Sequence, residues 1–526
     1  MFEVLSTPII VGLFAIWFCF LLLSYKGQPK GLWTLALANT GERFGYYTML
    51  AVFVLFLHDN FGFDSGWASE TFSNFLFVVY LLPLFGGMLA DKYGYSKMVV
   101  LGILIMFIGY LILSFPMGGS TPALVIMVTG LLLVSLGTGL FKGNLQVMVG
   151  DLYNEDKFAD KRDSGFSLFY MAINIGALFA PTAAIKIMDW AQASLDYSKA
   201  DAYHFAFAVA CVSVIGSILV YYLGKRTFAH VISTTKKANT SAAETQKAEV
   251  PVENDTKERI VCLCLVFAVV IFFWMAFHQN GLTLTWFADE FTATSSTGIE
   301  SMMFDVRNLL ALIFIVYGLF GIFQAKGIAR ILAGVMIVAA AAFLYNMIPA
   351  AGVETAVSAP IFQHFNPCFV VILTPVSVAL FGWLGKIGKE PKAPVKIGLG
   401  MLVAAVAYLL LALDSVGLPA ADPVNHPHLA NMGPSLLVRT YLILTFAELL
   451  LSPIGISFVT KVSPVKYKGM MMGGWFVATA IGNKLVSIPG HMWGMDLTIV
   501  WGTLMAICLL AAIFIFSIIK KLNKVA

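Results

Sequence analysis

The sequence predicts an all-α polytopic membrane protein. Of its 526 residues, 59% are hydrophobic and only 12% are charged, and the mean hydropathy is +0.85. Soluble domains carry roughly twice that charged fraction, about 25%. Apolar runs that suit membrane helices recur along the whole chain, and basic residues gather in alternate loops between them. Composition, apolar runs and loop charges therefore agree on the fold class.

The first half of the chain holds seven predicted spans. No positive charge precedes the first, near residues 8–23, and no small-residue cleavage site follows it, which favours a membrane helix over a signal peptide. Lys26 and Lys30 follow this run, so we expect Met1 outside and these lysines in the cytoplasm. The other six spans lie near residues 32–58, 69–90, 97–115, 122–145, 165–188 and 203–224.

A polar stretch over residues 225–257 separates two apolar halves. It is rich in Lys, Thr, Ala, Glu and Asn, which predicts a flexible cytoplasmic linker. The second half holds eight spans, near residues 259–287, 308–323, 329–349, 361–385, 397–413, 434–458, 470–488 and 497–519. The predicted units are an N-terminal helix (1–26), a bundle (27–224), the linker, a second bundle (258–519) and a cytoplasmic tail (520–526).

Loop charges give the orientation. The predicted outer loops hold mostly acids or no charge, as at Asp59, Asp64 and Asp422; only the loop after Lys186 is of mixed sign. The net charge of +4 therefore reflects topology and not nucleic-acid binding. The basic residues of the predicted inner loops are Lys92, Lys97, Lys157, Lys161, Arg162, Lys225, Arg226, Lys326, Arg330, Lys386, Lys389, Lys392, Lys396, Lys461, Lys466, Lys468, Lys520, Lys521 and Lys524.

One apolar run, near residues 32–58, contains side chains that membrane helices normally avoid. A charge at the bilayer centre costs about 2.5–3.5 kcal/mol on insertion scales, so such residues face a protein interior or a wet cavity. A Glu42–Arg43 pair that neutralises itself is one interpretation; a pathway for a polar solute is the other. The polar residues that share one broad face of this helix are Asn39, Glu42, Arg43, Tyr46 and Tyr47.

Seven short motifs, in matching order and spacing over most of residues 28–515, resemble those of proton-dependent oligopeptide transporters, a branch of the major facilitator superfamily. They are Gly41-Glu42-Arg43-Phe44-Gly45-Tyr46-Tyr47, Gly86-Gly87-Met88-Leu89-Ala90-Asp91-Lys92-Tyr93-Gly94, Gly139-Leu140-Phe141-Lys142, Phe166-Ser167-Leu168-Phe169-Tyr170-Met171-Ala172-Ile173-Asn174-Ile175-Gly176, Phe365-Asn366-Pro367, Glu448-Leu449-Leu450-Leu451-Ser452-Pro453 and Met472-Gly473-Gly474-Trp475-Phe476.

The resemblance implies the major facilitator fold, in which two six-helix bundles surround a cavity that opens alternately to each side. The run before Lys26 lies outside that core. The two runs joined by Gln324-Ala325-Lys326-Gly327 form an inserted hairpin, residues 307–350, between the family's seventh and eighth helices. We expect these three extra helices to be peripheral.

The resemblance also implies a site for short peptides, whose two charged ends need groups of opposite sign. Arg43 and Lys142 match its cations and are expected at the peptide carboxylate. Glu448 is expected at the ammonium group, assisted by Asn174 and Asn366. The aromatic positions that match the cavity lining are Tyr46, Tyr47, Tyr80, Tyr170 and Trp475.

Structural alternatives remain open for these residues. Lys142 could pair with Glu42 or with Glu448, and Asn366, before Pro367, could cap a helix or close a turn. Each aromatic taken singly could belong to the core. Lys484 is expected to reach the outer interface and to stay out of the site.

Proton coupling needs an acid whose protonation depends on conformation, and Glu42 is the expected one. The resemblance implies a conformational latch at Asp91. Three departures from the family pattern are Asn39 in place of a Glu, Leu50 in place of an Arg, and His278 in place of a Glu. The last two are lost together, which avoids an unpaired buried charge. His278 could titrate during transport or remain a neutral, hydrogen-bonded histidine.

The predicted function is a proton-coupled symporter for di- and tripeptides in a bacterial inner membrane, with the N-terminus outside and the C-terminus in the cytoplasm. The alternatives are a related transporter for amino acids, nitrate or drugs, and a non-transporting receptor or scaffold. No H-E-x-x-H, G-x-S-x-G or phosphate-binding glycine motif occurs, so an enzyme is not expected. The six cysteines lie in apolar runs, and neither a metal nor a cofactor is expected. Peptide preference and oligomeric state are not given by the sequence.

Overall fold

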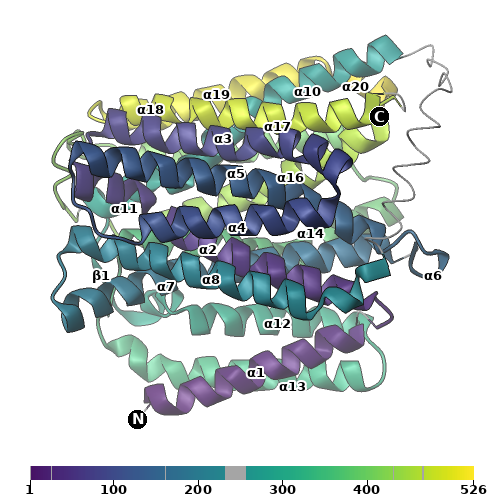
Figure 1. Cartoon of the computed structure of the whole chain (residues 1–526), viewed down its shortest axis with the longest axis horizontal. Coiled ribbons are helices and arrows are strands. Elements are labelled where there is room, and N and C mark those ends of the chain that lie inside the picture. The colour runs from purple at the N-terminus through teal and green to yellow at the C-terminus, as the bar shows by residue number, and fades with distance from the viewer. Residues whose placement is uncertain are drawn as a thin grey trace.

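The computed structural model describes residues 2–24, 26–159, 161–230, 256–430, 432–464 and 467–525. Most of the predicted linker, residues 231–255, lies outside the described residues, as does Lys466 among the predicted inner-loop lysines. The long helices run side by side along one direction, which is horizontal in Figure 1. Within the described ranges, twelve helices are long and apolar enough to cross a membrane.

In its described residues, the first half of the chain forms eight α-helices and a short 3-10 turn. They are α1 (Phe2–Ser24), α2 (Lys30–Phe61), α3 (Ser65–Tyr93), α4 (Tyr95–Leu113), α5 (Thr121–Asp151), α6 (Asp156–Ala159), α7 (Arg162–Leu195), α8 (Lys199–Leu223) and η1 (Lys225–Thr227).

Over residues 256–430, 432–464 and 467–525, the second half has further helices, four 3-10 turns and two strands of two residues each. They are α10 (Thr256–Phe277), η2 (His278–Gly281), α11 (Thr283–Phe291), β1 (Ser295–Ser296), η3 (Gly298–Phe304), α12 (Val306–Gln324), α13 (Ile328–Met347), η4 (Ile348–Gly352), β2 (Thr355–Ala356), η5 (Ala359–His364), α14 (Phe365–Lys386), α15 (Ala393–Asp414), α16 (Ser435–Val462), α17 (Lys468–Leu485), α18 (Ser487–His491), α19 (Leu497–Ser517) and α20 (Ile519–Val525). β1 and β2 form a short antiparallel pair.

Glycines set the closest helix contacts of the first half. A Cβ at Gly86 of α3 would collide with the backbone of Gly139 in α5. A Cβ at Gly102 of α4 would lie 2.6 Å from the carbonyl oxygen of Gly137 in α5. Because the hydrophobic effect between helices is absent in lipid, such close backbone packing supplies much of the association energy. The glycines of two sequence motifs therefore have a packing role.

The predicted continuous span near residues 259–287 is wrong in one respect, because the helix is interrupted at η2. The Gln279 side chain donates to the carbonyl oxygen of Val486 (3.1 Å), and the Tyr441 hydroxyl donates to that of Asn280 (2.7 Å). Side chains and carbonyls from α16 and the turn after α17 thus satisfy polar groups at the break, which is the condition for irregular backbone at membrane depth.

The three extra helices form one layer at the edge of the molecule. α1 packs on α12 and α13 at the lower edge of Figure 1, and α12 also packs against α7 and α14. The Trp17 ring of α1 lies 5.7 Å from Phe314 and 6.0 Å from Tyr317, both on α12. Phe20 fills the space that a side chain at Gly321 would need. The first helix therefore belongs, by packing, with the inserted hairpin.

Replacing Trp17 by Ala is expected to loosen this layer. Trp17 is 2% exposed, and removing such a buried ring costs about 3–5 kcal/mol in protein cores. We expect the unfolding midpoint, measured by intrinsic fluorescence in detergent, to fall by at least about 3 °C. Val11→Ala is the control, because Val11 is 61% exposed on the same helix. Equal shifts for the two variants would show that Trp17 does not hold the layer together.

Candidate functional site

Glu42 and Arg43 form a buried ion pair within α2. The Arg43 Nε lies 2.5 Å from Glu42 Oε2, and its Nη2 lies 2.7 Å from Oε1. Glu42 is 0% exposed and Arg43 3% exposed. The Arg43 guanidinium also lies 5.0 Å from the ring centre of Tyr46. The self-neutralising pair is therefore present, with both carboxylate oxygens bound by one guanidinium.

Lys142 of α5 lies over an aromatic ring. Its Nζ is 4.1 Å from the ring centre of Tyr80 in α3, a cation–π geometry. Among the described residues no ion pair of Lys142 with Glu42 or Glu448 is found, so neither alternative pairing occurs in this conformation. Lys142 is thus the predicted site cation whose charge is not taken up by a described carboxylate.

Glu448 of α16 and Asn366 of α14 are in direct contact. The Asn366 Nδ2 donates to Glu448 Oε2 at 2.9 Å and to the Thr445 hydroxyl at 3.1 Å. Asn366 is the second residue of α14, and its side chain bonds these α16 groups instead of capping its own helix. One carboxylate with an amide donor beside it therefore lies in the second half of the chain.

Tyr47 of α2 and Tyr80 of α3 are near both Arg43 and Glu448. Each is close enough to Arg43 and to Glu448 to interact electrostatically with both. On α7, Tyr170 is 44% exposed, and Asn174 donates to its carbonyl oxygen at 3.0 Å. Tyr47 and Tyr80 thus lie within electrostatic range of a cationic and an anionic side chain.

Two predicted aromatic residues are buried instead of lining open space. Trp475 is 2% exposed and packs its ring against Gly455 of α16, where a side chain would collide with it. Tyr46 is also 2% exposed, and its ring stacks on Phe75 with centres 6.2 Å apart. In this conformation both residues pack the walls behind the charged groups.

His278 lies at the helix break, η2. Its Nδ1 is 2.6 Å from the Asn483 side-chain oxygen of α17, and its ring stacks on Trp274 with centres 5.0 Å apart. The ring centre of Tyr80 is 5.9 Å away, so His278 and Lys142 flank the same tyrosine. The hydrogen-bonded arrangement is observed, and a coupling role for His278 stays a prediction.

Two ends of the bundle differ in charge. The acidic end carries Asp59, Asp64 and Asp422; the basic end carries Lys92 and Lys392. Asp91, the predicted latch, lies exposed at the basic end and accepts a hydrogen bond from the Tyr95 hydroxyl. The first helix, α1, begins at one end of the bundle, and the last helix, α20, ends at the opposite end (Figure 1).

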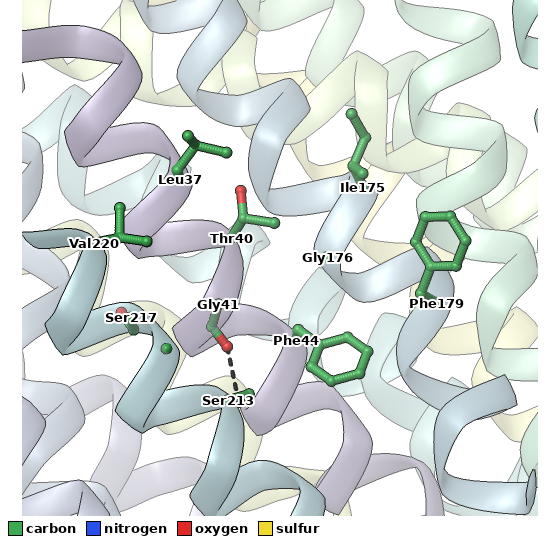
Figure 2. A pocket seen from close by; sticks show the side chains of 11 residues that line it. Leu37, Thr40, Gly41, Phe44, Ile175, Gly176, Phe179, Ser213, Ser217 and Val220 are labelled. Atoms are coloured by element: carbon green, nitrogen blue, oxygen red, sulfur yellow. Dashed lines mark hydrogen bonds between the residues drawn. The ribbon is translucent and has the colours of Figure 1, made fainter. Parts of the chain in front are cut away.

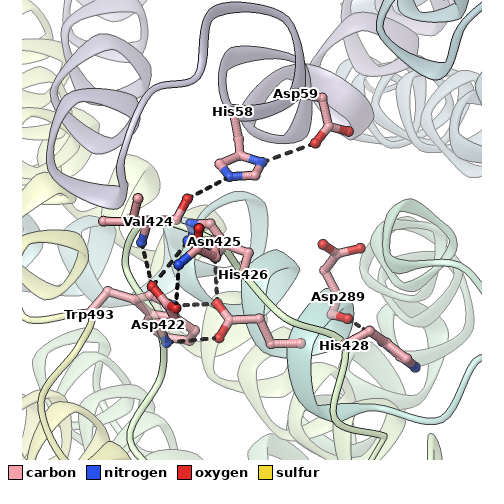
Figure 3. A network of polar contacts seen from close by, with 10 residues as sticks. His58, Asp59, Asp289, Asp422, Val424, Asn425, His426, His428 and Trp493 are labelled. Carbon is pink, nitrogen blue, oxygen red and sulfur yellow. Dashed lines mark hydrogen bonds and ion pairs between the residues drawn. The ribbon is translucent and has the colours of Figure 1, made fainter.

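At the acidic end, the loop between α15 and α16 connects the two halves. The Ser65 backbone N–H donates to the carbonyl oxygen of Pro423 at 2.8 Å. The His58 Nε2 lies 3.1 Å from the carbonyl oxygen of Val424 (Figure 3). Because Ser65 and His58 belong to the first half, this loop bridges the halves at one end only.

Glu290 of α11 contacts the same loop through hydrogen bonds. Its Oε1 accepts a hydrogen bond from Trp493 Nε1 at 2.6 Å and lies 2.5 Å from His426 Nδ1. Figure 3 shows His426 and Trp493 close to Asp422. Hydrogen bonds from the Asn425 side chain and from nearby backbone N–H groups lower the pKa of Asp422 below its ordinary value. The loop is thus held in one conformation against the second half.

Lys484 of α17 lies near the acidic end of the bundle and contacts the first half of the chain. Its Nζ forms an ion pair with Glu70 of α3 and donates to the Asn74 side-chain oxygen at 2.7 Å. This contact joins α17 to α3, and so the second half to the first, near the acidic end. The sequence did carry a signal: Glu70 and Asn74 are four residues apart on one helical face.

The sequence matches the model of a known protein family. The model of the POT family matches residues 96–248 and 335–492, which together exceed half of the sequence. The chain belongs to the POT family. It is accordingly a multi-pass integral membrane protein of a transporter family. The motifs that resemble proton-dependent oligopeptide transporters are confirmed in this sense.

Individual relatives cover nearly the whole chain. The "Uncharacterized transporter YclF" of Bacillus subtilis (strain 168) is 29% identical over 528 residues, 95% of this chain and 96% of that protein. The "Di-/tripeptide transporter" of Lactococcus lactis subsp. lactis (strain IL1403) is 26% identical, over 88% of this chain and 89% of its own. A crystal structure of a peptide transporter POT in complex with sulfate is 23% identical, with TM-score 0.71, over 95% of this chain and 96% of that one, and it shows the fold.

Weakening the Glu70–Lys484 contact is expected to open the acidic end more often. Both side chains are more than one-third exposed, and such pairs contribute about 0.2–1 kcal/mol, or up to about fivefold in a population ratio. In the full chain with its native cysteines replaced, spin labels at Met117 and Val416 report the distance between the halves at this end. Lys484→Met is expected to increase the long-distance population.

The charge swap Glu70→Lys with Lys484→Glu provides the matched control. It keeps an ion pair across the same two helices, so it should restore the short-distance population. An unchanged distance distribution in Lys484→Met, or a swap no better than the single variant, would show that this pair does not hold the acidic end closed.

Proposed function

We propose that this protein is a proton-coupled symporter that imports di- and tripeptides by alternating access. The arrangement that carries the proposal is the polar cluster within the two bundles. Lys142 and Arg43 supply positive charge from the first half, and Glu448 with Asn366 supplies an anionic end from the second. Relatives named as di-/tripeptide transporters, in two subspecies of Lactococcus lactis, support the same substrate class.

Each end of a peptide has a proposed partner. Lys142 attracts the carboxylate first, because its charge has no described carboxylate partner. Glu448 accepts from the ammonium group, and Asn366, which already donates to Glu448, fixes the orientation of that carboxylate. Asn174 and the hydroxyl groups of Tyr47, Tyr80 and Tyr170 complete the proposed contacts along the peptide. Tyr46 and Trp475 contribute the packed wall behind them.

Proton coupling follows from the Glu42–Arg43 pair. While Glu42 is ionised, its two oxygens occupy the guanidinium of Arg43. Protonation of Glu42 removes that partner and leaves a buried cation, which the peptide carboxylate then neutralises. Release of the proton toward the cytoplasm re-forms the pair and expels the carboxylate. His278, which shares Tyr80 with Lys142, is proposed to tune this step.

The proposed direction of transport depends on the charges at the two ends of the bundle. We assign the acidic end to the outside and the basic end to the cytoplasm of a bacterial inner membrane, with the N-terminus outside. Cross-half contacts at Ser65, His58 and Lys484 close the acidic end, while Tyr170 and Glu448 retain exposure below them. The described conformation is therefore proposed to open inward, with Asp91 as a latch at the cytoplasmic end and the α12–α13 hairpin, like α1, outside the transport core.

Uptake of labelled dialanine into proteoliposomes tests the substrate class. With an inside-negative potential and a lower pH outside, we expect accumulation that excess unlabelled tripeptide abolishes and that nitrate or free alanine leaves nearly unchanged. N-acetyl-dialanine, which lacks the ammonium group, should compete at least about tenfold less well, because Glu448 would face no cation. Uptake that di- and tripeptides fail to reduce would overturn the peptide assignment.

Replacing Glu42 by Gln is expected to uncouple transport from the proton gradient. The variant cannot bind or release the proton, so dialanine should still exchange across the membrane but should not accumulate above equilibrium. Counterflow and pH-driven uptake in the same vesicles separate the two activities. The control is Glu300→Gln, a carboxylate in η3 near the acidic end. Accumulation by Glu42→Gln under an imposed pH gradient would assign coupling to another residue.

A further inference from the structure

A groove lies on the surface of the first half of the chain. Its lining does not include Glu42, Arg43, Lys142 or Glu448, which are called the charged cluster below. It encloses about 360 Å³ between α2, α7 and α8, part-way along all three helices (Figure 2). Its walls are formed mostly by carbon atoms and by the glycines of α2, α7 and α8. The lining residues on which the argument depends are Leu37, Thr40, Phe44, Ser213, Gly216 and Val220.

The hydroxyl groups in this groove are already satisfied. Thr40 donates to the backbone oxygens of Ala36 (2.9 Å) and Ala172 (3.0 Å). Ser213 donates to the backbone oxygen of Gly41 at 3.0 Å, a bond drawn in Figure 2, and Ser217 donates to that of Ala38. With these donors used internally, the groove presents an apolar surface. Such a surface suits hydrocarbon better than a peptide.

Three basic residues lie at the basic end of α2 and α8. Lys30 opens α2, and Lys225 and Arg226 lie in η1, directly after α8. The Thr227 and Thr34 hydroxyl groups are 3.0 Å apart, and this bond fastens η1 to the first turns of α2. All three basic side chains are exposed, and no ion pair with a described carboxylate is found for any of them.

The spacing of charge and groove matches a phospholipid. At 1.5 Å per residue, Leu37 lies about 10 Å and Phe44 about 21 Å along α2 from Lys30. On α8, Val220 precedes Lys225 by about 8 Å. One leaflet contributes about 15 Å of hydrocarbon, so a chain whose phosphate rests at the basic cluster extends into the groove.

We propose that the groove binds one acyl chain of an anionic phospholipid whose phosphate contacts Lys30, Lys225 and Arg226. The site is independent of the proposed peptide site, because none of its lining residues belongs to the charged cluster. Anionic lipid is favoured over zwitterionic lipid because basic residues near the membrane surface gain about 1 kcal/mol each from negative headgroups.

A photoactivatable phosphatidylglycerol with a diazirine in mid-chain tests the proposal on the full chain in phosphatidylethanolamine vesicles. We expect labelled peptides from α2 and α8, and competition by unlabelled phosphatidylglycerol at least about fivefold stronger than by phosphatidylcholine. Gly216→Phe should abolish this labelling, because no atom lies within 4 Å of a Cβ at that position and the new ring can enter the groove. Ile215→Phe, at a 40% exposed neighbour, is the matched control and should label normally.

A second set of variants tests the contact between the lipid phosphate and the basic residues. Changing Lys30, Lys225 and Arg226 to Gln should remove the preference for phosphatidylglycerol, whereas changing Lys92 and Lys97, on another basic loop, should preserve it. These variants leave the helix interior unchanged, so their readout does not depend on the folding of Gly216→Phe. Labelling that Gly216→Phe leaves intact, or equal competition by the two lipids, would show an ordinary lipid contact and overturn the proposal.

Discussion

The buried Glu42–Arg43 pair is the constraint on which the proposed transport cycle depends. Taking either charge out of water alone costs several kcal/mol, so neither side chain can lose its partner without a replacement. When Glu42 is protonated, Arg43 needs another carboxylate as its partner, and when Arg43 moves away, ionised Glu42 needs another cation. In the proposed cycle, protonation and peptide binding are therefore linked by charge balance in α2. Lys142, which lies over Tyr80, is the proposed second cation for the incoming carboxylate.

The charged cluster was predictable because membrane helices contain so few charges. Each intramembrane Glu, Arg or Lys stands out against an apolar background, and hydropathy also locates the helices to within a few residues. The meeting of Asn366 with Glu448 follows from matching motifs on two helices. The break at η2 was not predictable, since its hydrogen bonds come from Tyr441 and Val486, more than a hundred residues away. Hydropathy alone reads that segment as one continuous span.

Aromatic residues and edge charges were harder to place. Periodicity shows that Trp475 faces the interior, but only the opposing Gly455 decides that its ring fills a packing gap instead of lining open space. Lys484 poses the same problem with a charge. A lysine near a helix end can extend toward the interface, but the sequence does not show that its partner is Glu70 on a different helix. In both cases the missing information is the neighbour across the helix interface.

The three extra helices link the halves in a way that bears on their relative motion. α1 joins α2, and so the first half, at the basic end, whereas α12 and α13 join the second half at the acidic end, where β1 and β2 pair across the insertion. α1 packs on both helices of the hairpin. The layer therefore connects the basic end of the first half with the acidic end of the second half. Phe20 fills the space beside Gly321, and this close fit opposes sliding of α1 along α12. Any relative movement of the two halves therefore has to be accommodated elsewhere than at this contact.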